Sequence, residues 1–375
     1  MRRGEGQLSN PENTMTNKLR CGLIGATGLA GQQFISALQN HPLFTLTALA
    51  ASPRSAGKSY ADALKAPNGM MGWFLTEQLP PEIAKMIVVA GSELTSNNLD
   101  LVFSAVEADV ARELEPKLAR DLPVISAASA FRYDDDVPLI IPPVNAHHSE
   151  LIRAQQKGRN TKGFIAPIPN CTTTGLAITL APLEDAFGVQ AVLMTSMQAV
   201  SGAGRSPGVA ALDIIDNVVP HISKEEHKVE VETKKILGAA NKPHGVKVSS
   251  TCTRVAVLEG HTEAAYVSLK KKASVQEVAA AMREWKGHEQ TRGLPSSPPR
   301  WIEVLDDPFR PQPRLDRDVH GGMATSVGRI REDGVLENGV KYVLVSHNTK
   351  MGAAKGAVLL AELLKAQGFV GPRAG

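Results

Sequence analysis

The sequence predicts two domains, a doubly wound α/β domain followed by an α+β domain. Its 375 residues, 43% of them hydrophobic, are enough to form two separate cores. Before about residue 165, short apolar runs alternate with segments of helical periodicity, and after it strand-like runs follow one another. Strict alternation is typical of a parallel sheet between two layers of helices, whereas strands in succession favour antiparallel pairing.

The first domain, expected over residues 18–165, is predicted mainly from its strands. Short, continuous apolar runs indicate strands that are covered on both faces. The spacing of Phe34, Ile35 and Leu38 indicates a helix over 31–39. The strands are expected at 19–24, 44–50, 86–89, 99–106 and 123–126.

The second domain, expected over residues 166–346, has longer β-like runs and fewer helices. Its helices are predicted at 223–237 and 275–285, and residues 287–318, rich in Pro, Arg and Asp, are predicted to form a long loop. Strands in runs predict a largely antiparallel sheet. They are expected at 189–200, 246–258, 263–269 and 340–346.

The two ends of the chain are predicted separately. Residues 1–17 are polar and lack the apolar stretch of a signal peptide, so we expect a disordered leader, and Met15 is a possible alternative start. Residues 347–375 contain a segment with apolar positions at helical spacing. We expect this last helix, over 352–367, to pack back on the first domain.

Composition argues against several classes of function. The net charge is only +3, and aromatic residues make up 4%, so nothing indicates nucleic-acid binding. No apolar run approaches the roughly 18 residues of a membrane span. Cys21, Cys171 and Cys252 lie far apart without metal-ligand spacing. We therefore expect no metal site, no disulfide framework and a reducing, cytoplasmic location.

A glycine-rich turn, GATGLAG, follows the first predicted strand and opens the first helix. Glycines allow the backbone to turn tightly and approach a pyrophosphate, which the N–H groups of the helix N-terminus then bind. The alternative is a tight turn without a ligand. The candidate nucleotide-binding residues are Gly25, Thr27, Gly28, Leu29, Ala30 and Gly31.

The end of the second strand favours NADP(H) over NAD(H). An NAD site would place an acidic residue there for the ribose hydroxyls, but this segment reads ASPRSAGK. An acid would repel the 2′-phosphate, whereas Arg54 with the hydroxyls of Ser52 and Ser55 would bind it. The alternative is an ordinary polar turn.

A single cysteine begins the helical segment in PNCTTTG. Cys171 follows Asn170 at the predicted first turn, where unpaired N–H groups and the helix dipole favour the nucleophilic thiolate. N–H groups left over at this terminus are expected to hold an oxyanion on the attacked carbonyl. The alternative is a small buried residue, as most free cysteines are.

A thiolate needs a base, and His261 is the best candidate among ten histidines. It lies in TRVAVLEGHTE, seven residues after Arg254, so strict alternation along one strand would place the two on opposite faces. A bulge or kink at Gly260 would bring both toward one site. The alternative is a structural histidine in a strand.

Charged residues near 225 and 132 complete the candidate site. Ser223 and Glu226 fit a capping box at a helix start. Glu225 and Lys228 form either a surface ion pair or a pair that recognises a zwitterion, one binding an ammonium group and the other an anion. Arg132 is expected to end a first-domain strand near the cleft, as an anion-binding or a solvated arginine.

Taken together, these segments resemble the aspartate-β-semialdehyde dehydrogenase family from about residue 19 to residue 368. GATGLAG, PNCTTTG and TRVAVLEGHTE match in the family's order, as do MQAVSGAG and the final NTKMGAAKG. The spelling PNCTTTG and the long C-terminal helix are similar to the archaeal and fungal branch.

The resemblance implies an NADP-binding Rossmann domain, a catalytic and dimerisation domain, and a homodimer or homotetramer. It implies NADPH-dependent reductive dephosphorylation of L-aspartyl-4-phosphate to L-aspartate-4-semialdehyde through a cysteine thioester, within threonine, methionine and isoleucine biosynthesis and, in some organisms, lysine biosynthesis. Cys171 would be the nucleophile, His261 the acid/base, and Gln198 the residue that orients the intermediate.

The resemblance also implies roles for the binding residues. Arg254 would bind the α-carboxylate and Glu225 the α-amino group of the substrate. Phosphate, which is also the inorganic product, would be bound by Asn170, Arg132 and Lys228. Besides the residues of the glycine-rich turn and the 52–55 segment, those implied to contact the cofactor are Ser104, Ser201, Gly202, Asn348 and Gly352.

Three other functions fit parts of this pattern. N-acetyl-γ-glutamyl-phosphate reductase shares the chemistry, but its acylated nitrogen has no ammonium to pair with Glu225. Malonyl-CoA reductase, which resembles the archaeal branch, would need a CoA channel in place of a phosphate site. A non-catalytic NADP-sensing regulator would keep GATGLAG but would have little need of Cys171, His261 and Arg254 together.

Overall fold

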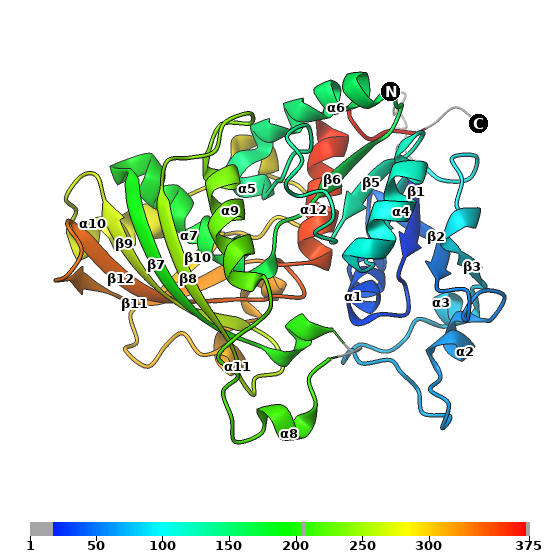
Figure 1. Cartoon of the computed structure of the whole chain (residues 1–375), viewed down its shortest axis with the longest axis horizontal. Helices are drawn as coiled ribbons and strands as arrows, with labels where there is room; N and C mark the ends of the chain where they lie inside the picture. The colour runs from blue at the N-terminus through cyan, green and yellow to red at the C-terminus, as the bar shows by residue number, and fades with distance from the viewer. Residues whose placement is uncertain (1–17, 205–207, 373–375) are drawn as a thin grey trace, which may run out of the picture.

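The computed structural model describes residues 18–204 and 208–372, which form two lobes, each built around its own sheet (Figure 1). The expected leader, with Met15, lies outside the described residues. In the part of the chain that the structure describes, no helix has the length and apolar character needed to cross a bilayer.

The first lobe contains a six-stranded, fully parallel sheet in the order β3-β2-β1-β4-β5-β6. The order reverses between β1 and β4, so the loops after these strands diverge and open a crevice at their carboxyl ends. The strands are β1 Leu19–Ile24, β2 Phe44–Ala51, β3 Val88–Ala90, β4 Leu101–Ser104, β5 Pro123–Ser126 and β6 Phe164–Pro167.

Helices complete this lobe, and the last helix of the chain returns to it as expected. The C-terminal helix α12 (Ala354–Ala366) packs against α1 (Leu29–Leu38), and Phe34 and Leu360 share one core cluster (Figure 1). The other helices of the lobe are α2 Tyr60–Leu64, α3 Pro81–Lys85, α4 Ala108–Ala119, α5 Pro142–Asn145 and α6 Leu151–Arg159.

The second lobe is built on a six-stranded sheet in the order β10-β11-β12-β9-β7-β8. Three of its pairings are antiparallel, but β10 pairs with β11 and β7 with β8 in parallel, so the sheet is mixed rather than simply antiparallel. Its strands are β7 Val189–Gln198, β8 Lys247–Arg254, β9 His261–Leu269, β10 Ile302–Leu305, β11 Thr325–Asp333 and β12 Gly339–Ser346.

Helices cover one face of the mixed sheet and leave the other open. The long helices α7 (Cys171–Phe187), α9 (Glu225–Leu237) and α10 (Val275–Glu284) contact its strands. On the opposite face Leu193 and Tyr266 remain exposed. The short helices α8 (Ala211–Ile214) and α11 (Pro313–Asp316) lie in connections.

Two expectations about this fold are corrected by the structure. The predicted loop 287–318 contains β10 and α11. Each of these elements has only four residues, which is too short for a recognisable periodicity in the sequence. The first sheet also includes β6, so it extends to Pro167, two residues beyond the expected boundary at 165.

Candidate active site

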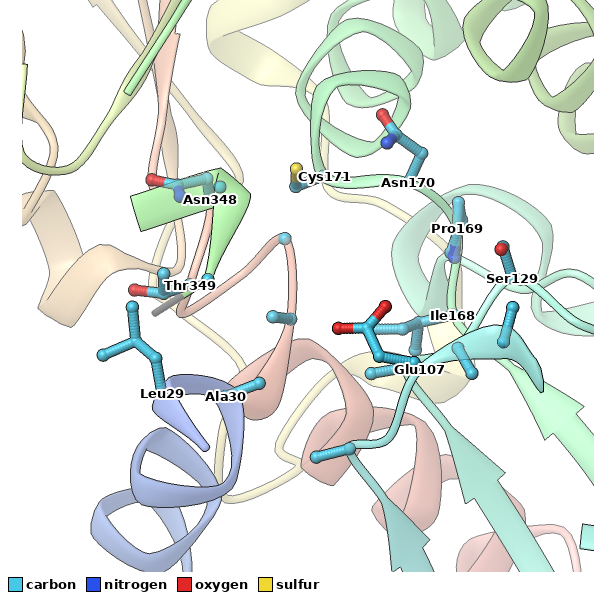
Figure 2. Close-up of a pocket in the computed structure, with 18 of the residues that line it drawn as sticks. Leu29, Ala30, Glu107, Ser129, Ile168, Pro169, Asn170, Cys171, Asn348 and Thr349 are labelled. Atoms are coloured by element: carbon cyan, nitrogen blue, oxygen red, sulfur yellow. The ribbon is translucent and has the colours of Figure 1, made fainter. Parts of the chain in front are cut away.

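A cavity of about 340 Å³ lies at the carboxyl ends of the parallel strands, between the two lobes. Its walls come from the start of α1, the loops after β4, β5 and β6, and the segment before α12 (Figure 2). Cys171 faces this space from the start of α7, opposite Leu29 and Asn348. The crevice predicted from strand topology is therefore the place where the candidate nucleophile lies.

The helix α7 begins at Cys171, as expected, but three of the four backbone N–H groups of its first turn are already occupied. Oδ1 of Asn170 accepts hydrogen bonds from the N–H groups of Thr172 and Thr173, at 2.9 and 3.2 Å. The N–H of Thr174 donates to the Asn170 carbonyl. These three N–H groups are not free to bind an oxyanion, because Asn170 accepts from all of them. Among the described residues the N–H of Cys171 has no acceptor, so the expected oxyanion contact is limited to that one group of this turn.

His261 contacts the nucleophile and is held in one tautomer. The Sγ of Cys171 lies 3.2 Å from Nε2 of His261. On the other side of the ring, the backbone N–H of Ala199 donates to Nδ1 at 3.1 Å. Because a backbone N–H can only donate, Nδ1 is unprotonated, and the ring proton is on Nε2, directed at the sulfur.

Burial favours the uncharged forms of both side chains. It lowers the pKa of His261 to about 3, with Glu225 raising and Arg254 lowering it further. It raises the pKa of Cys171 to about 12, an effect that Glu225 reinforces and nearby cations oppose. Glu263, two residues along β9, is fully buried, and burial holds its pKa well above its ordinary value. The thiolate expected from the helix dipole is thus outweighed by desolvation.

The strand register explains how Arg254 and His261 reach one site. Gln198, at the end of β7, pairs with Arg254 at the end of β8. Met197 pairs with Thr262, which places His261 beside Gln198 from the other side. Arg254 and His261 therefore flank β7 on two different strands. The chain turns between these strands, and Gly260, with a φ of 93°, directly precedes His261, so the structure has the expected kink rather than a bulge within one strand.

A buried polar network joins these residues to α9. Arg254 Nη1 donates to the carbonyl of Ala199 at 2.8 Å, and Gln198 Nε2 donates to Glu225 Oε1 at 3.3 Å. Glu225 is 5% exposed and also accepts from Asn170 Nδ2 and Lys228 Nζ, at 2.7 and 3.1 Å. The pair with Lys228 exists, but it is largely buried rather than a surface ion pair.

The predicted capping box at the start of α9 does not form. The helix begins at Glu225, after Lys224 in a left-handed conformation with φ of 61°, and no side chain caps it. The carboxylate of Glu226 instead accepts a hydrogen bond from the backbone N–H of Cys252 in β8, at 3.1 Å. Packing against the sheet has replaced the local cap.

Arg132 lies six residues beyond the end of β5, not at the end of a strand, and it is buried rather than solvated. Its Nη1 forms an ion pair with Glu232 at 3.0 Å, and it lines the cavity. Glu232 was not predicted, because a glutamate within EEHKVEVETKK is typical of a solvated helix face. Only the packing of α9 shows that it is buried.

The expected cofactor residues divide into those that line the cavity and those that shape it. Gly25 has a φ of 77°, and a Cβ on Gly31 would come within 2.3 Å of the Gly25 carbonyl, so glycine is required at both positions. Thr27 and Gly28 lie in the same turn. The residues that line the cavity directly are Leu29, Ala30, Ser201, Gly202, Asn348 and Gly352.

The remaining cofactor candidates lie outside the cavity lining. Ser52, Arg54 and Ser55 form a turn after β2, with Ser52 and Arg54 exposed, next to the glycine-rich turn, whose backbone N–H groups bond to the end of β2. Ser104 is fully buried at the end of β4, so its side chain is not placed to contact a ligand. Within residues 18–204 and 208–372, no group of three or more His, Cys, Asp or Glu side chains is arranged to hold a metal.

Comparison with known proteins gives consistent matches over both lobes. Residues 20–152 match the semialdehyde dehydrogenase NAD binding domain, and residues 180–351 match the semialdehyde dehydrogenase dimerisation domain. The chain is 46% identical to the aspartate-semialdehyde dehydrogenase of Methanothermobacter thermautotrophicus, over 92% of this chain and 98% of that protein. It is 45% identical to the Candida albicans protein of the same name, over 94% of this chain and 99% of the other.

Solved structures give the same relationship. The crystal structure of aspartate semialdehyde dehydrogenase with NADP from Candida albicans superposes with a TM-score of 0.83 at 41% identity, covering 94% of this chain and 100% of that one. Aspartate semialdehyde dehydrogenase II from Vibrio cholerae, complexed with ASA, superposes with a TM-score of 0.73 at 28% identity, covering 93% and 99%.

Proposed function

This chain belongs to the aspartate-semialdehyde dehydrogenase family, and we propose that its cavity performs the NADPH-dependent conversion of L-aspartyl-4-phosphate to L-aspartate-4-semialdehyde and phosphate. The observation that carries the proposal is the 3.2 Å contact between Cys171 Sγ and His261 Nε2, beside the glycine-rich turn. The archaeal and fungal relatives agree with the branch expected from the sequence.

The residues around the cavity fit a dinucleotide. The turn from Gly25 to Gly31 brings backbone N–H groups and the start of α1 to the crevice, and its tight path requires that Gly25 and Gly31 carry no Cβ. We assign Leu29, Ala30, Ser201, Gly202, Asn348 and Gly352 to the cofactor, because they line one continuous surface that reaches Cys171. NADPH supplies the hydride that reduces the thioester.

Cys171 is assigned as the nucleophile. Its thiol proton is lost to solvent, and Arg132, Arg254 and Lys228, which lower the pKa of Cys171, stabilise the thiolate. The sulfur attacks the acyl carbon, a carbon–sulfur bond forms, and the carbon–oxygen bond to phosphate breaks. After reduction the carbon–sulfur bond breaks, the aldehyde carbonyl forms, and the thiolate is regenerated.

His261 is assigned a narrower role than a general acid/base. Its Nδ1 is occupied by the Ala199 N–H, so a second ring proton has no place there. Thiolate attack and thiolate departure both proceed without a proton from the ring. His261 therefore acts as a neutral donor, whose Nε2–H binds the thiolate and then the oxyanion, in place of the N–H groups that Asn170 occupies.

We assign substrate recognition to two buried charged side chains of this network, Arg254 and Glu225. Arg254 suits a bidentate contact with the α-carboxylate, and Glu225 suits the α-ammonium group, with Gln198 between them orienting the intermediate. Asn170, Arg132 and Lys228 line the cavity near Cys171, so they are assigned to the phosphate.

The direct test measures phosphate-dependent reduction of NADP with L-aspartate-4-semialdehyde as substrate. Malonate semialdehyde with CoA tests malonyl-CoA reductase activity, and an N-acetylated γ-semialdehyde tests the N-acetyl-γ-glutamyl-phosphate reductase reaction. We expect turnover that requires phosphate and a free amino group. Equal or greater turnover with either alternative substrate would overturn the assignment, and binding of NADP without any turnover would favour the sensing regulator.

We also propose that the chain forms a homodimer, or a tetramer built from such dimers, through the open face of the mixed sheet. Leu193 and Tyr266 are 47% and 38% exposed there, on adjacent strands β7 and β9. A family dimerisation domain spans this lobe. We expect Leu193→Asp to shift the mass measured by light scattering from dimer toward monomer. An unchanged mass would place the interface elsewhere.

A further inference from the structure

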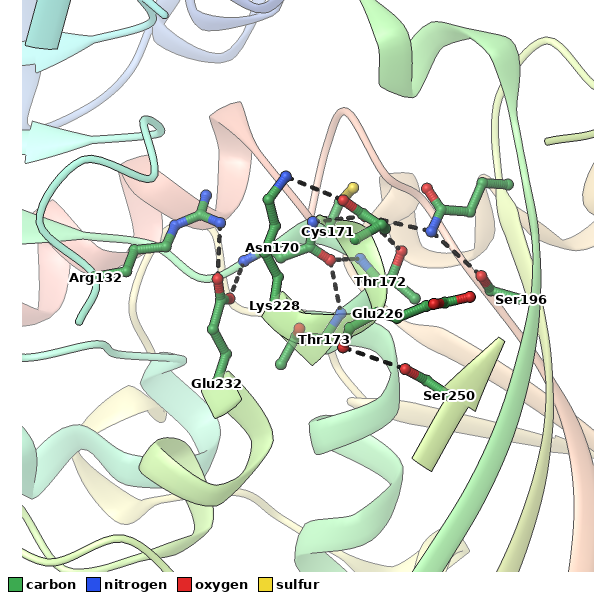
Figure 3. A network of polar contacts seen from close by, with 12 residues as sticks. Arg132, Asn170, Cys171, Thr172, Thr173, Ser196, Glu226, Lys228, Glu232 and Ser250 are labelled. Carbon is green, nitrogen blue, oxygen red and sulfur yellow. Dashed lines mark hydrogen bonds and ion pairs between the residues drawn. The ribbon is translucent and has the colours of Figure 1, made fainter. Parts of the chain in front are cut away.

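A fully buried carboxylate on α9 connects both lobes behind the cavity. One oxygen of Glu232 accepts from Nη1 of Arg132 at 3.0 Å and from the hydroxyl of Tyr133 at 3.3 Å. The other accepts from the backbone N–H of Asn170 at 2.6 Å (Figure 3). Arg132 and Tyr133 belong to the loop after β5, and Asn170 immediately precedes Cys171.

This arrangement determines the position of Arg132. The other terminal nitrogen of its guanidinium donates to the carbonyl of Ala127 at 3.0 Å. Its Nε is buried and finds no hydrogen-bond partner among residues 18–204 and 208–372, although the side chain lines the cavity. Protein acceptors therefore fix both terminal nitrogens of a guanidinium that lines the cavity.

Charge alone does not explain why a carboxylate is present. A buried carboxylate carries a large desolvation cost, which an ion pair with good geometry offsets. Glu232 partly neutralises Arg132 and so weakens its attraction for an anion, but it also fixes the guanidinium against the backbone of the nucleophile's helix. For a reaction that needs the phosphate and the thiol at a set distance, position matters more than net charge.

We propose that Glu232 is a positioning residue, which fixes the separation between the phosphate-binding guanidinium of Arg132 and Cys171 by bonding Arg132 and the Asn170 N–H with its two oxygens. This inference rests on the proposed function, since it concerns the phosphate subsite of that reaction. Glu232 touches neither the substrate nor the cofactor in this assignment, and it acts through Arg132.

Glu232→Gln tests this with little change in volume. An amide has only one acceptor oxygen, so its NH₂ must face either Arg132 or the Asn170 N–H, and that contact is lost. Glu232→Asp keeps the negative charge but shortens the side chain by one methylene group. Tyr133→Phe is the matched control, because it removes only the 3.3 Å hydrogen bond and leaves the ion pair intact.

Three quantities are measured for each variant: NADP affinity by fluorescence, kcat/KM for phosphate, and kcat/KM for L-aspartate-4-semialdehyde at saturating phosphate. We expect Glu232→Gln to lower kcat/KM for phosphate by roughly tenfold or more, with a smaller loss for the semialdehyde and unchanged NADP affinity. Glu232→Asp should be nearly as impaired, since position rather than charge is lost. Tyr133→Phe should stay within about threefold of wild type.

Two results would overturn the inference. One is an unchanged kcat/KM for phosphate in Glu232→Gln, and the other is an equal loss in all three quantities, which indicates general structural damage. Full rescue by Glu232→Asp would also contradict it, because charge alone would then suffice. If the wild-type protein shows no phosphate-dependent turnover, the proposed function fails instead, so the two failures are distinguishable.

Discussion

The Sγ of Cys171 and the Nε2 of His261 lie 3.2 Å apart, although 90 residues separate them in the chain. One belongs to the first turn of α7 and the other to the first residue of β9. The two meet because α7 packs against β9, with Cys171 and His261 at the first residue of each element. The backbone N–H of Ala199 then orients the imidazole from its far side.

Cys171→Ser should leave NADP binding intact and lower turnover by at least about a thousandfold, because a hydroxyl lacks an accessible anion near neutral pH. Steady-state rates and a fluorescence titration of NADPH on the purified variant check this. Turnover comparable to wild type, or loss of cofactor binding alone, would contradict the assignment of Cys171.

The pH dependence of alkylation tests the neutral state of the Cys171–His261 pair. Burial raises the pKa of Cys171 to about 12 and lowers that of His261 to about 3, so the reactive thiolate is a minor form at neutral pH. The rate of labelling by iodoacetamide should therefore rise about tenfold per unit between roughly pH 6 and pH 9. A thiolate–imidazolium pair would instead give a labelling rate that is constant over this range, which would contradict the role of His261 as a neutral donor.

The other cysteines allow this measurement to be assigned to one thiol. Cys21 and Cys252 are fully buried, so labelling of the folded protein should report on Cys171. The matched control is Cys171→Ser, which should remain unlabelled over the same time. Labelling of this variant at the wild-type rate would show that another thiol reacts.

Arg54→Glu should weaken NADPH far more than NADH, by about ten- to a hundredfold, because the new charge would repel only the 2′-phosphate. Arg54 is exposed in the turn after β2, so the change should not disturb the core. Fluorescence titrations with both cofactors provide the comparison. Equal losses would indicate that Arg54 is structural.

Glu225→Gln and Arg254→Lys separate the substrate hypotheses. Glu225→Gln removes a buried counter-charge, and Arg254→Lys keeps the charge but loses the bidentate contact with a carboxylate. We expect each change to cost on the order of 2–5 kcal/mol of transition-state binding. Glu225→Gln should impair the free amino acid semialdehyde but hardly affect an N-acetylated analogue or malonate semialdehyde. The measurement is kcat/KM for the three substrates. If Glu225→Gln leaves kcat/KM for L-aspartate-4-semialdehyde unchanged, Glu225 does not bind the substrate and is only a structural partner of Lys228 and Asn170.

Much of the fold and of the site follows from local patterns in the sequence. The strands at 19–24 and 123–126 were predicted to the residue, because buried parallel strands are short apolar runs with clear ends. The glycine-rich turn was predicted in place, since its backbone tolerates no Cβ at Gly25 and Gly31. Cys171 was predicted at a helix start from the prolines and asparagine before it.

Tertiary structure alone decided which of these residues meet and in what electrostatic state. Periodicity shows which face of a strand a residue occupies, but not that β8 and β9 flank β7, which is what brings Arg254 and His261 together. Burial likewise depends on how whole elements pack. A glutamate that looks solvated in the sequence becomes the buried partner of Arg132, and a cysteine at a helix N-terminus has its pKa raised, because desolvation outweighs the helix dipole.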